Sequence, residues 1–198
     1  MKRLLGFVLL FSFGFLFACS SGSVNGEVVI DQQTKDDVQF NVMDLLADQF
    51  GMWDITINDK TASEIEVTVD HYVNGEKQEP IIQMSTVLDD SNKSRKLNLV
   101  IAEQVHNDES KWIAAFIEED GLTSGETFAP SIDEFHSKTY SSISVPFTGE
   151  VGETIMLYSI LVSDSEEPIA THTIYEDEIE EPQLENYDHA YIMTLKVK

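Results

Sequence analysis

The chain has 198 residues, with 36 acidic residues against 12 lysines and arginines, a formal charge of −24 at pH 7, and one cysteine. A surface this negative repels nucleic acid and anionic lipid headgroups, so we expect no nucleic-acid partner. One cysteine excludes an intramolecular disulfide, so packing alone must hold the core together.

The first 18 residues have the pattern of an export signal. Lys2 and Arg3 precede an uncharged apolar run at residues 4–18. The run is shorter than the roughly 20 residues that a membrane-spanning helix needs, whereas it fits the apolar part of a secretory signal. We therefore predict a signal peptide at residues 1–18 rather than a membrane span.

The single cysteine follows this run in the stretch Leu16-Phe17-Ala18-Cys19. The stretch resembles the lipobox of bacterial lipoproteins, with Phe17 in place of the usual small residue. The resemblance implies cleavage before Cys19 and acyl chains, such as palmitate, on Cys19. It places the protein at the extracytoplasmic face of the cell membrane, or at the outer membrane of a cell with two membranes. The alternative is an ordinary signal peptide with an incidental cysteine.

Residues 19–26 are rich in serine and glycine and are predicted to form a flexible tether, which leaves residues 27–198 as one domain. Apolar residues alternate with polar ones in short segments along this domain. The pattern predicts an all-β antiparallel sandwich of immunoglobulin-like architecture, with about ten strands and one or two short helical turns. The expected strands lie at residues 27–30, 52–57, 95–105, 111–120, 142–147, 154–162, 169–175 and 191–197, with a hairpin at residues 64–87.

The hairpin carries Asn74-Gly75, the preferred pair for a two-residue type I′ turn. This turn predicts that Val67 lies opposite Ile82 and that Ile65 lies opposite Met84. Apolar residues then meet on one face, as a half-buried hairpin requires.

Two segments have helical features. Residues 38–50 have apolar residues at helical spacing, although their first half also alternates as a strand would. Ser131 and Glu134 have the spacing of a capping box at the start of residues 131–138. The surrounding residues 121–140 fit equally a long connection or the seam between two sheets.

No catalytic motif stands out. Residues 121–125 resemble a nucleophile elbow, but Thr123 occupies the position of the serine. The five histidines, none at ligand spacing, leave open a metal site assembled by the fold; they are His71, His106, His136, His172 and His189. The sequence favours a non-enzymatic protein, and the alternative is an envelope hydrolase whose serine or carboxylate site is assembled only in the fold.

An acidic segment at residues 176–188 is the one local cluster with a ligand hypothesis. Ca²⁺ binds six to eight oxygens, and neighbouring carboxylates supply them. The candidate ligands are Glu176, Asp177, Glu178, Glu180 and Glu181. The alternative is a solvated acidic loop. Trp53, Tyr72 and Trp112 are candidates for a peptide or glycan platform, with core packing as the alternative.

The leading functional hypothesis is a lipid-anchored, extracytoplasmic binding or interaction module of the bacterial envelope. Its expected partners are the membrane, through Cys19, and an envelope protein, peptide or glycan. A rigid sandwich that presents variable loops is suited to this role. The alternatives are a Ca²⁺-dependent adhesion or sensor domain and the envelope hydrolase; otherwise no cofactor is expected.

Overall fold

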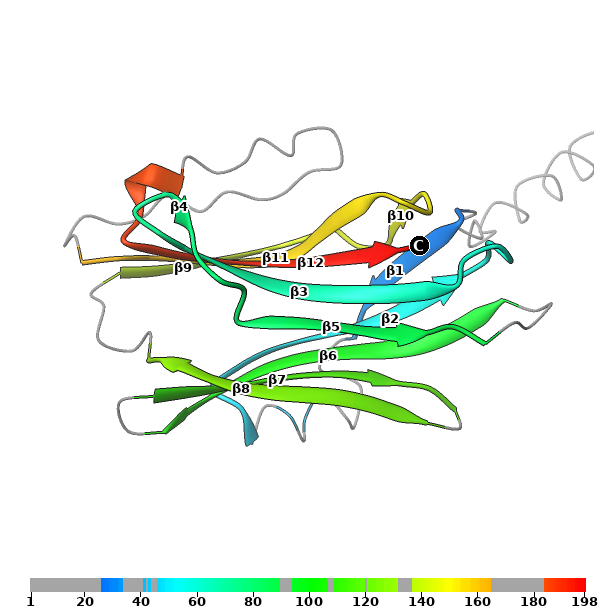
Figure 1. Cartoon of the computed structure of the whole chain (residues 1–198), viewed down its shortest axis with the longest axis horizontal. Coiled ribbons are helices and arrows are strands. Elements are labelled where there is room, and N and C mark those ends of the chain that lie inside the picture. The colour runs from blue at the N-terminus through cyan, green and yellow to red at the C-terminus, as the bar shows by residue number, and fades with distance from the viewer. Residues whose placement is uncertain are drawn as a thin grey trace, which may run out of the picture.

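A computed structural model describes residues 26–33, 41, 43, 46–89, 94–106, 109–119, 121–131, 137–164 and 184–198. These residues form twelve strands in two six-stranded antiparallel sheets, which pack face to face (Figure 1). The prediction of an all-β antiparallel sandwich is confirmed. The strands outnumber the seven to nine of an immunoglobulin domain.

Sheet A joins strands from both halves of the chain. Its order is β10 (Phe147–Gly149), β1 (Val28–Gln32), β2 (Gln49–Ile57), β6 (Arg95–His106), β7 (Glu109–Ile117) and β8 (Leu122–Pro130). Strands β6, β7 and β8 follow one another in the sequence and form a meander. All the pairings in the sheet are antiparallel.

Sheet B is built around the C-terminal strand. Its order is β4 (Glu76–Lys77), β3 (Glu64–Val73), β12 (His189–Val197), β11 (Thr154–Ser163) and β9 (Ser137–Ser142), and β5 (Ile82–Val87) pairs with β3 beyond β4. A 3₁₀ turn, η1 (Leu184–Asn186), precedes β12.

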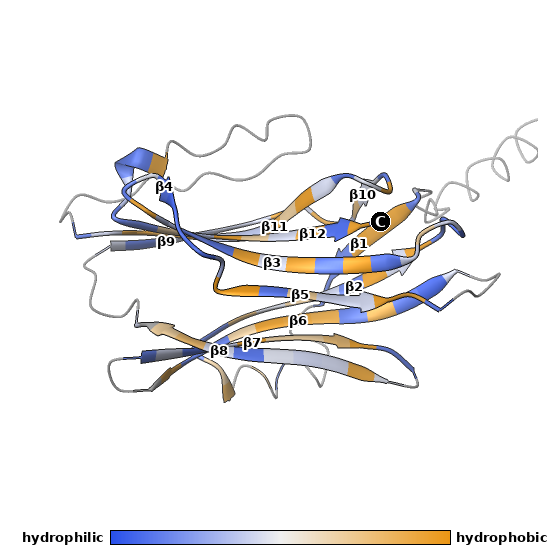
Figure 2. Cartoon of the chain, viewed as in Figure 1, coloured by the Kyte–Doolittle hydropathy of each residue, from blue (hydrophilic) through white to orange (hydrophobic). Residues whose placement is uncertain are grey.

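The core lies between the sheets because alternate residues of each strand point inward. In β3, the side chains of Ile65, Val67 and Val69 are fully buried, and Figure 2 shows this alternation as orange and blue bands along the strand. A second, smaller cluster lies on the outer face of sheet B. It contains Met156, Leu161, Ala190 and Ile192, with Tyr72, Leu184 and Tyr187 packed against them.

The register predicted for the hairpin is wrong by two residues. The Asn74-Gly75 turn forms, with positive φ at both residues, and β4 pairs with β3 in the predicted register. Beyond β4, however, Val67 lies opposite Met84 rather than Ile82, and Ile65 lies opposite Thr86. The amides of Gln78 and Ile81 still donate to carbonyls of β3, both at 2.8 Å, so the shift arises between these two residues, where Pro80 has no amide hydrogen to donate. A shift of two residues keeps the same side chains facing the core.

The prediction of one strand at residues 142–147 is also wrong. β9 ends at Ser142 in sheet B, and the chain crosses to sheet A, where Phe147 pairs with Ile30. Ile143 and Phe147 are both buried because they point into the same core from opposite sheets. The resulting spacing of buried apolar residues is the same as the alternation in a single strand.

The region 121–140 holds strand β8 at one edge of sheet A, which was not predicted, and the first residues of β9 at one edge of sheet B, so the chain changes sheets here. Near residues 38–50, the amide of Ala47 donates to the carbonyl of Met43 at 2.9 Å, a helical turn, and strand β2 begins at Gln49. The expected turn after Ser131 and the expected strand at 169–175 lie outside the described residues.

The sandwich has two distinct ends. At the end where β1 begins, here named the tether end after the predicted tether, Asn58 donates to the carbonyl of Gly26 at 2.8 Å, and the amide of Ser63 donates to the carbonyl of Lys198 at 2.6 Å. At the far end, the amide of Asn74 donates to the carbonyl of Asp188 at 3.1 Å. These ends lie at the right and the left of Figure 1.

Candidate functional site

Two histidines meet at the far end, on the inner face of sheet B. His71 on β3 and His189 on β12 lie on the strand face that also carries the buried Val69 and Met193, because they are separated from these residues by even numbers of positions. His71 Nε2 and His189 Nδ1 are 2.9 Å apart. At this distance one imidazole donates and the other accepts, so the contact holds a single proton.

An aromatic column links this histidine pair to sheet A. The ring of His71 stacks on Tyr191 with centroids 4.8 Å apart, and Tyr191 stacks on Trp112 of β7 at 5.5 Å. Trp112 and Tyr191 are nearly fully buried, whereas both histidines are half-buried. The column therefore runs from the middle of the core to the half-exposed far end.

The two histidines resist protonation to different degrees. Burial, and then the charge of His189, lower the pKa of His71. Burial also lowers the pKa of His189, but the carboxylates of Asp188 and Asp164 oppose this effect. His189 is therefore the first of the pair to take up a proton, and a second proton on His71 would place two positive charges in contact.

A carboxylic acid is buried beside the same column. Glu103 is 1% exposed and continues the inward row of β6. Burial, then the charges of Tyr140 and Glu103, raise the pKa of Tyr158 well above its ordinary range. Burial and Glu103 do the same to the pKa of Tyr191. Titratable groups thus cluster inside this end of the sandwich, a frequent property of functional sites.

The space beside Glu103 is small. A cavity of about 10 Å³ is lined by Gln49, Phe50, Ile101, Ala102, Glu103, Trp112, Tyr158, Ile160 and Met193. This is the size of one water molecule, so a substrate does not fit. The indole nitrogen of Trp112 and the hydroxyl of Ser110 are buried nearby and make no hydrogen bond with the described residues. The cluster alone therefore gives no support to a hydrolase.

A second polar site lies on the outer face of sheet B. A depression of about 300 Å³ is lined by Glu66, Thr68, Asp70, Lys77, Pro80, Gln83, Thr154, Thr194 and Lys196. Its two acids and two lysines balance in charge. Lys77 Nζ lies 2.7 Å from Asp70 Oδ2, and this hydrogen bond is the main cause of the raised pKa of Lys77.

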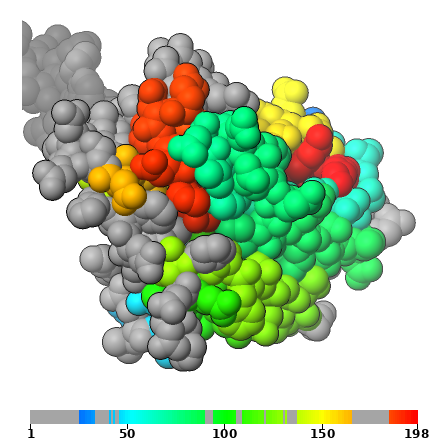
Figure 3. Space-filling view, turned by 60° about the vertical axis from the view of Figure 1, so that its left-hand side comes forward, coloured from blue at the N-terminus to red at the C-terminus, as the bar shows by residue number. Residues whose placement is uncertain are grey.

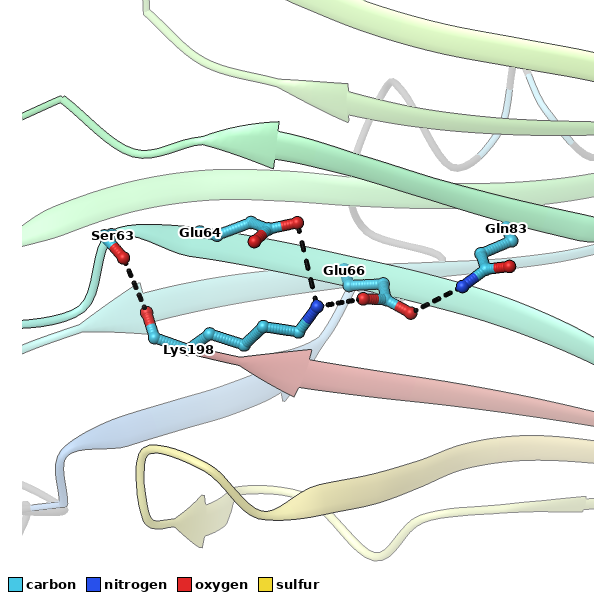
Figure 4. A network of polar contacts seen from close by, with 5 residues as sticks. All are labelled: Ser63, Glu64, Glu66, Gln83 and Lys198. Carbon is cyan, nitrogen blue, oxygen red and sulfur yellow. Dashed lines mark hydrogen bonds and ion pairs between the residues drawn. The ribbon is translucent and has the colours of Figure 1, made fainter.

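The rim of this depression is a fixed network (Figure 4). The ammonium group of Lys198 donates to Glu66 and lies 3.7 Å from Glu64, and Gln83 donates to Glu66 at 3.1 Å. The hydrogen bond from Lys198, and then that from Gln83, lower the pKa of Glu66. The charged groups thus neutralise one another, and the depression has no strong preference for a charged ligand.

The structure answers some of the site predictions. Cys19 and the candidate Ca²⁺ ligands Glu176, Asp177, Glu178, Glu180 and Glu181 lie outside the described residues. Both proposals stay predictions, and a melting shift with millimolar Ca²⁺ beyond that of NaCl at matched ionic strength would test the second. No group of three or more metal-ligating side chains occurs among the described residues. In the same part of the chain, no helix is long and apolar enough to cross a membrane.

The aromatic platform predicted as one alternative is wrong. Trp53 and Trp112 are completely buried in the core, and Tyr72 packs on the outer face of sheet B. The pairing of His71 with His189 was not predicted. His71 lies in the predicted hairpin, and His189 lies just before the predicted strand at residues 191–197. The two are far apart in the sequence, and only the β3–β12 pairing brings them together.

A protein-family model described as the YgaN domain matches residues 29–197. The chain belongs to the YgaN domain family. The YgaN domain extends from the second residue of β1 to the last residue of β12, so it includes both sheets and the far-end cluster. No curated protein and no solved structure matches the chain. The family description gives no activity, ligand or partner.

Proposed function

We propose that this protein is a lipid-anchored binding module of the bacterial envelope, held on the extracytoplasmic side of its membrane, and that its far end meets the partner. The observation that supports the orientation is the position of β1. The chain enters the sandwich at Val28, beside the tether end, whereas the Asn74-Gly75 turn and η1 lie at the far end.

The dimensions fit this arrangement. A strand of nine residues spans roughly 30 Å, so the far end stands about that distance from the point where the tether joins. The formal charge of −24 adds repulsion from anionic headgroups, which keeps the domain off the membrane surface. A tether of the predicted length leaves the domain free to reach a partner.

The far end also has features that are typical of a recognition surface. Figure 3 shows the orange-red residues around η1 packed against the green residues of the β3–β4 turn, so two segments distant in sequence form one surface. A Cβ on Gly75 would lie 2.9 Å from backbone atoms of Glu185. Loops held by such close contacts on a rigid sandwich are suited to binding a protein, peptide or glycan.

Site-specific cross-linking in cells tests the proposal. A photo-activated amino acid replaces Glu76 at the far end, with replacement of Lys60 at the tether end as the matched control; both residues are exposed. We expect a reproducible adduct from position 76 and a weaker one from position 60. Equal adducts, or adducts from position 60 alone, would contradict the orientation.

The anchor is tested separately with Cys19→Ala in the same cells. We expect the unchanged chain in the membrane fraction and the variant outside it, with loss of the adduct from position 76. If the variant remains in the membrane fraction, the lipid anchor is wrong. If no adduct forms from either position in the anchored protein, the binding module is wrong.

A further inference from the structure

The free edge of sheet A is formed by β8. Within the described ranges β8 pairs with β7 alone, over nine residues. Two of its side chains are exposed apolar groups, Leu122 at 66% and Phe128 at 60%. We propose that a second copy of this chain adds to this edge, with β8 antiparallel to β8 of the second copy and Gly125 at the two-fold axis. The proposal concerns β8 only and does not depend on the membrane anchor.

The charge of β8 is compatible with pairing at this edge. The chain carries a formal charge of −24, so two copies repel one another in most orientations. β8 has one charged residue, Glu126, whose carboxylate lies 2.6 Å from Lys111 Nζ. Natural edge strands are commonly protected by lysines, bulges or short length. β8 contains no lysine and is one of the longer strands.

The side chains of β8 are complementary to themselves. With Gly125 opposite Gly125, Phe128 of one copy lies opposite Leu122 of the other, and this contact occurs twice. Thr127 then lies opposite Thr123, and Glu126 lies opposite Ser124. Apolar and hydroxyl pairs of this kind stabilise antiparallel strands, and a two-fold axis makes the interface isologous.

Neighbouring registers are less favourable. A shift of two positions in one direction places Glu126 opposite Glu126, and it moves Phe128 from Leu122 to Ser124. A shift in the other direction places Leu122 opposite Glu126 and leaves Phe128 beyond the end of the strand. Like charges directly opposite each other destabilise a ladder. The pattern therefore selects the register centred on Gly125.

The inner face of β8 is already filled. Thr86 of β5 lies 3.3 Å from Thr123 between their hydroxyl oxygens, and a Cβ on Gly125 would be 3.7 Å from the sulfur of Met84. β5 has no charged residue, so a second copy meets no like charge there. In Figure 3 the yellow-green residues of β8 lie at the surface, below the green strands of sheet B. Pairing would join two six-stranded sheets edge to edge.

A charge-exchange experiment tests this interface. The full chain, of 22.3 kDa, is studied in detergent by sedimentation equilibrium, with the double variants Leu122→Glu/Phe128→Glu and Leu122→Lys/Phe128→Lys. We expect the unchanged chain to dimerise and to do so more strongly as salt rises, because salt screens the repulsion. Each double variant alone should associate at least tenfold more weakly. An equal mixture should recover a dimer, since each introduced carboxylate then faces an introduced ammonium group.

The control is Val87→Glu, since Val87 on β5 is 80% exposed and lies outside the proposed ladder; it should associate as the unchanged chain does. Ser124→Lys should tighten the dimer several-fold, because it places an ammonium group opposite Glu126 twice. The proposal is wrong if the unchanged chain stays monomeric at every salt concentration. It is equally wrong if the mixture gives no dimer while Ser124→Lys leaves the association unchanged.

Discussion

The two ends of the sandwich are closed by different kinds of side chain. At the tether end the core consists of aliphatic residues such as Ile57, Ile65 and Val197, each with no exposed surface. At the far end the same inward positions carry His71 and His189, and the strands beside them carry tyrosine, tryptophan and glutamic acid. The core of one end is aliphatic, with Arg95 donating to the carbonyls of Asp59 and Ala62 at its border, and the other end contains polar groups that can change their protonation.

Because of this difference, the stability of the two ends should respond differently to mutation and to pH. Aliphatic packing is insensitive to pH, so the core at the tether end should respond to changes in side-chain volume rather than to pH. The far end should respond to acid, because its buried bases must gain charge. Three substitutions and one change of pH test this difference.

Ile65→Ala should cause the largest loss, about 2–5 kcal/mol of unfolding free energy, because it leaves a cavity in the tether-end core. Urea unfolding at pH 7.5 and pH 5.5 measures it. The loss should be the same at both values, since no titratable group lies in this part of the core. A loss that changes with pH would remove the distinction between the ends.

Gly75→Ala should cost about 2 kcal/mol, because a Cβ at φ +81 is strained and would also lie 2.9 Å from the backbone of Glu185. The matched control is Gly152→Ala at the tether end, where φ is +91 and no atom lies within 4 Å of the added Cβ. Thermal melting of both variants separates strain from contact. Equal losses would mean that the turn and η1 are not held together.

Lowering the pH from 7 to 5.5 should lower stability through the histidine pair, by less than Gly75→Ala does, because both imidazoles are half-exposed and solvent screens their charges. Burial lowers the pKa of both residues in the folded state below the ordinary 6.5, so the unfolded chain takes up protons first. Stability is therefore constant above about pH 6.5 and falls below it, by at most about 1.4 kcal/mol per pH unit for each histidine.

The control for this pH dependence is His71→Gln, which should make the fall shallower. Imidazole signals followed by NMR should show His189 titrating before His71. If the variant loses stability as steeply as the unchanged chain, the acid response comes from elsewhere.

Glu66→Gln should have the smallest effect, below about 0.5 kcal/mol, because its partner Lys198 is exposed and solvent screens the pair. The pKa of Glu66 is lowered in the folded state, so this small contribution exists above the ordinary value of 4.5 and disappears as the pH falls. Melting with and without added salt measures it, and a loss comparable to that of Ile65→Ala would show that the network holds sheet B.

The tether-end core was largely predictable, whereas two local features of the fold were not. Alternation in β3 and β12 places Val67 and Leu195 correctly because each strand has one strongly apolar face. β8 was not recognised, since its inward positions hold Thr123, Gly125 and Thr127 rather than large apolar residues. The crossing after Ser142 was mistaken for a strand because two sheets point apolar residues into one space.

The candidate site could not be predicted from the sequence, for a different reason. The histidine contact depends on the register of β3 with β12, and the two histidines are 118 residues apart in the sequence. The alternation of apolar residues places each histidine at an inward position only once the pairing of β3 with β12 is known. Trp53 and Trp112 lie in the core, as the sequence favoured, but the column of Trp112 with Tyr191 and the histidines is a property of the pairing.

The position of β12 also constrains the order in which the protein can be completed. The last strand of the chain is the central strand of sheet B, paired over nine positions with β3 and along its other edge with β11. The β6–β7–β8 meander forms from neighbouring segments, whereas sheet B must wait for a contact of long sequence separation. During folding, the inner face of sheet A therefore exists before its cover, and the pairing of β12 with β3 decides whether the domain closes or aggregates.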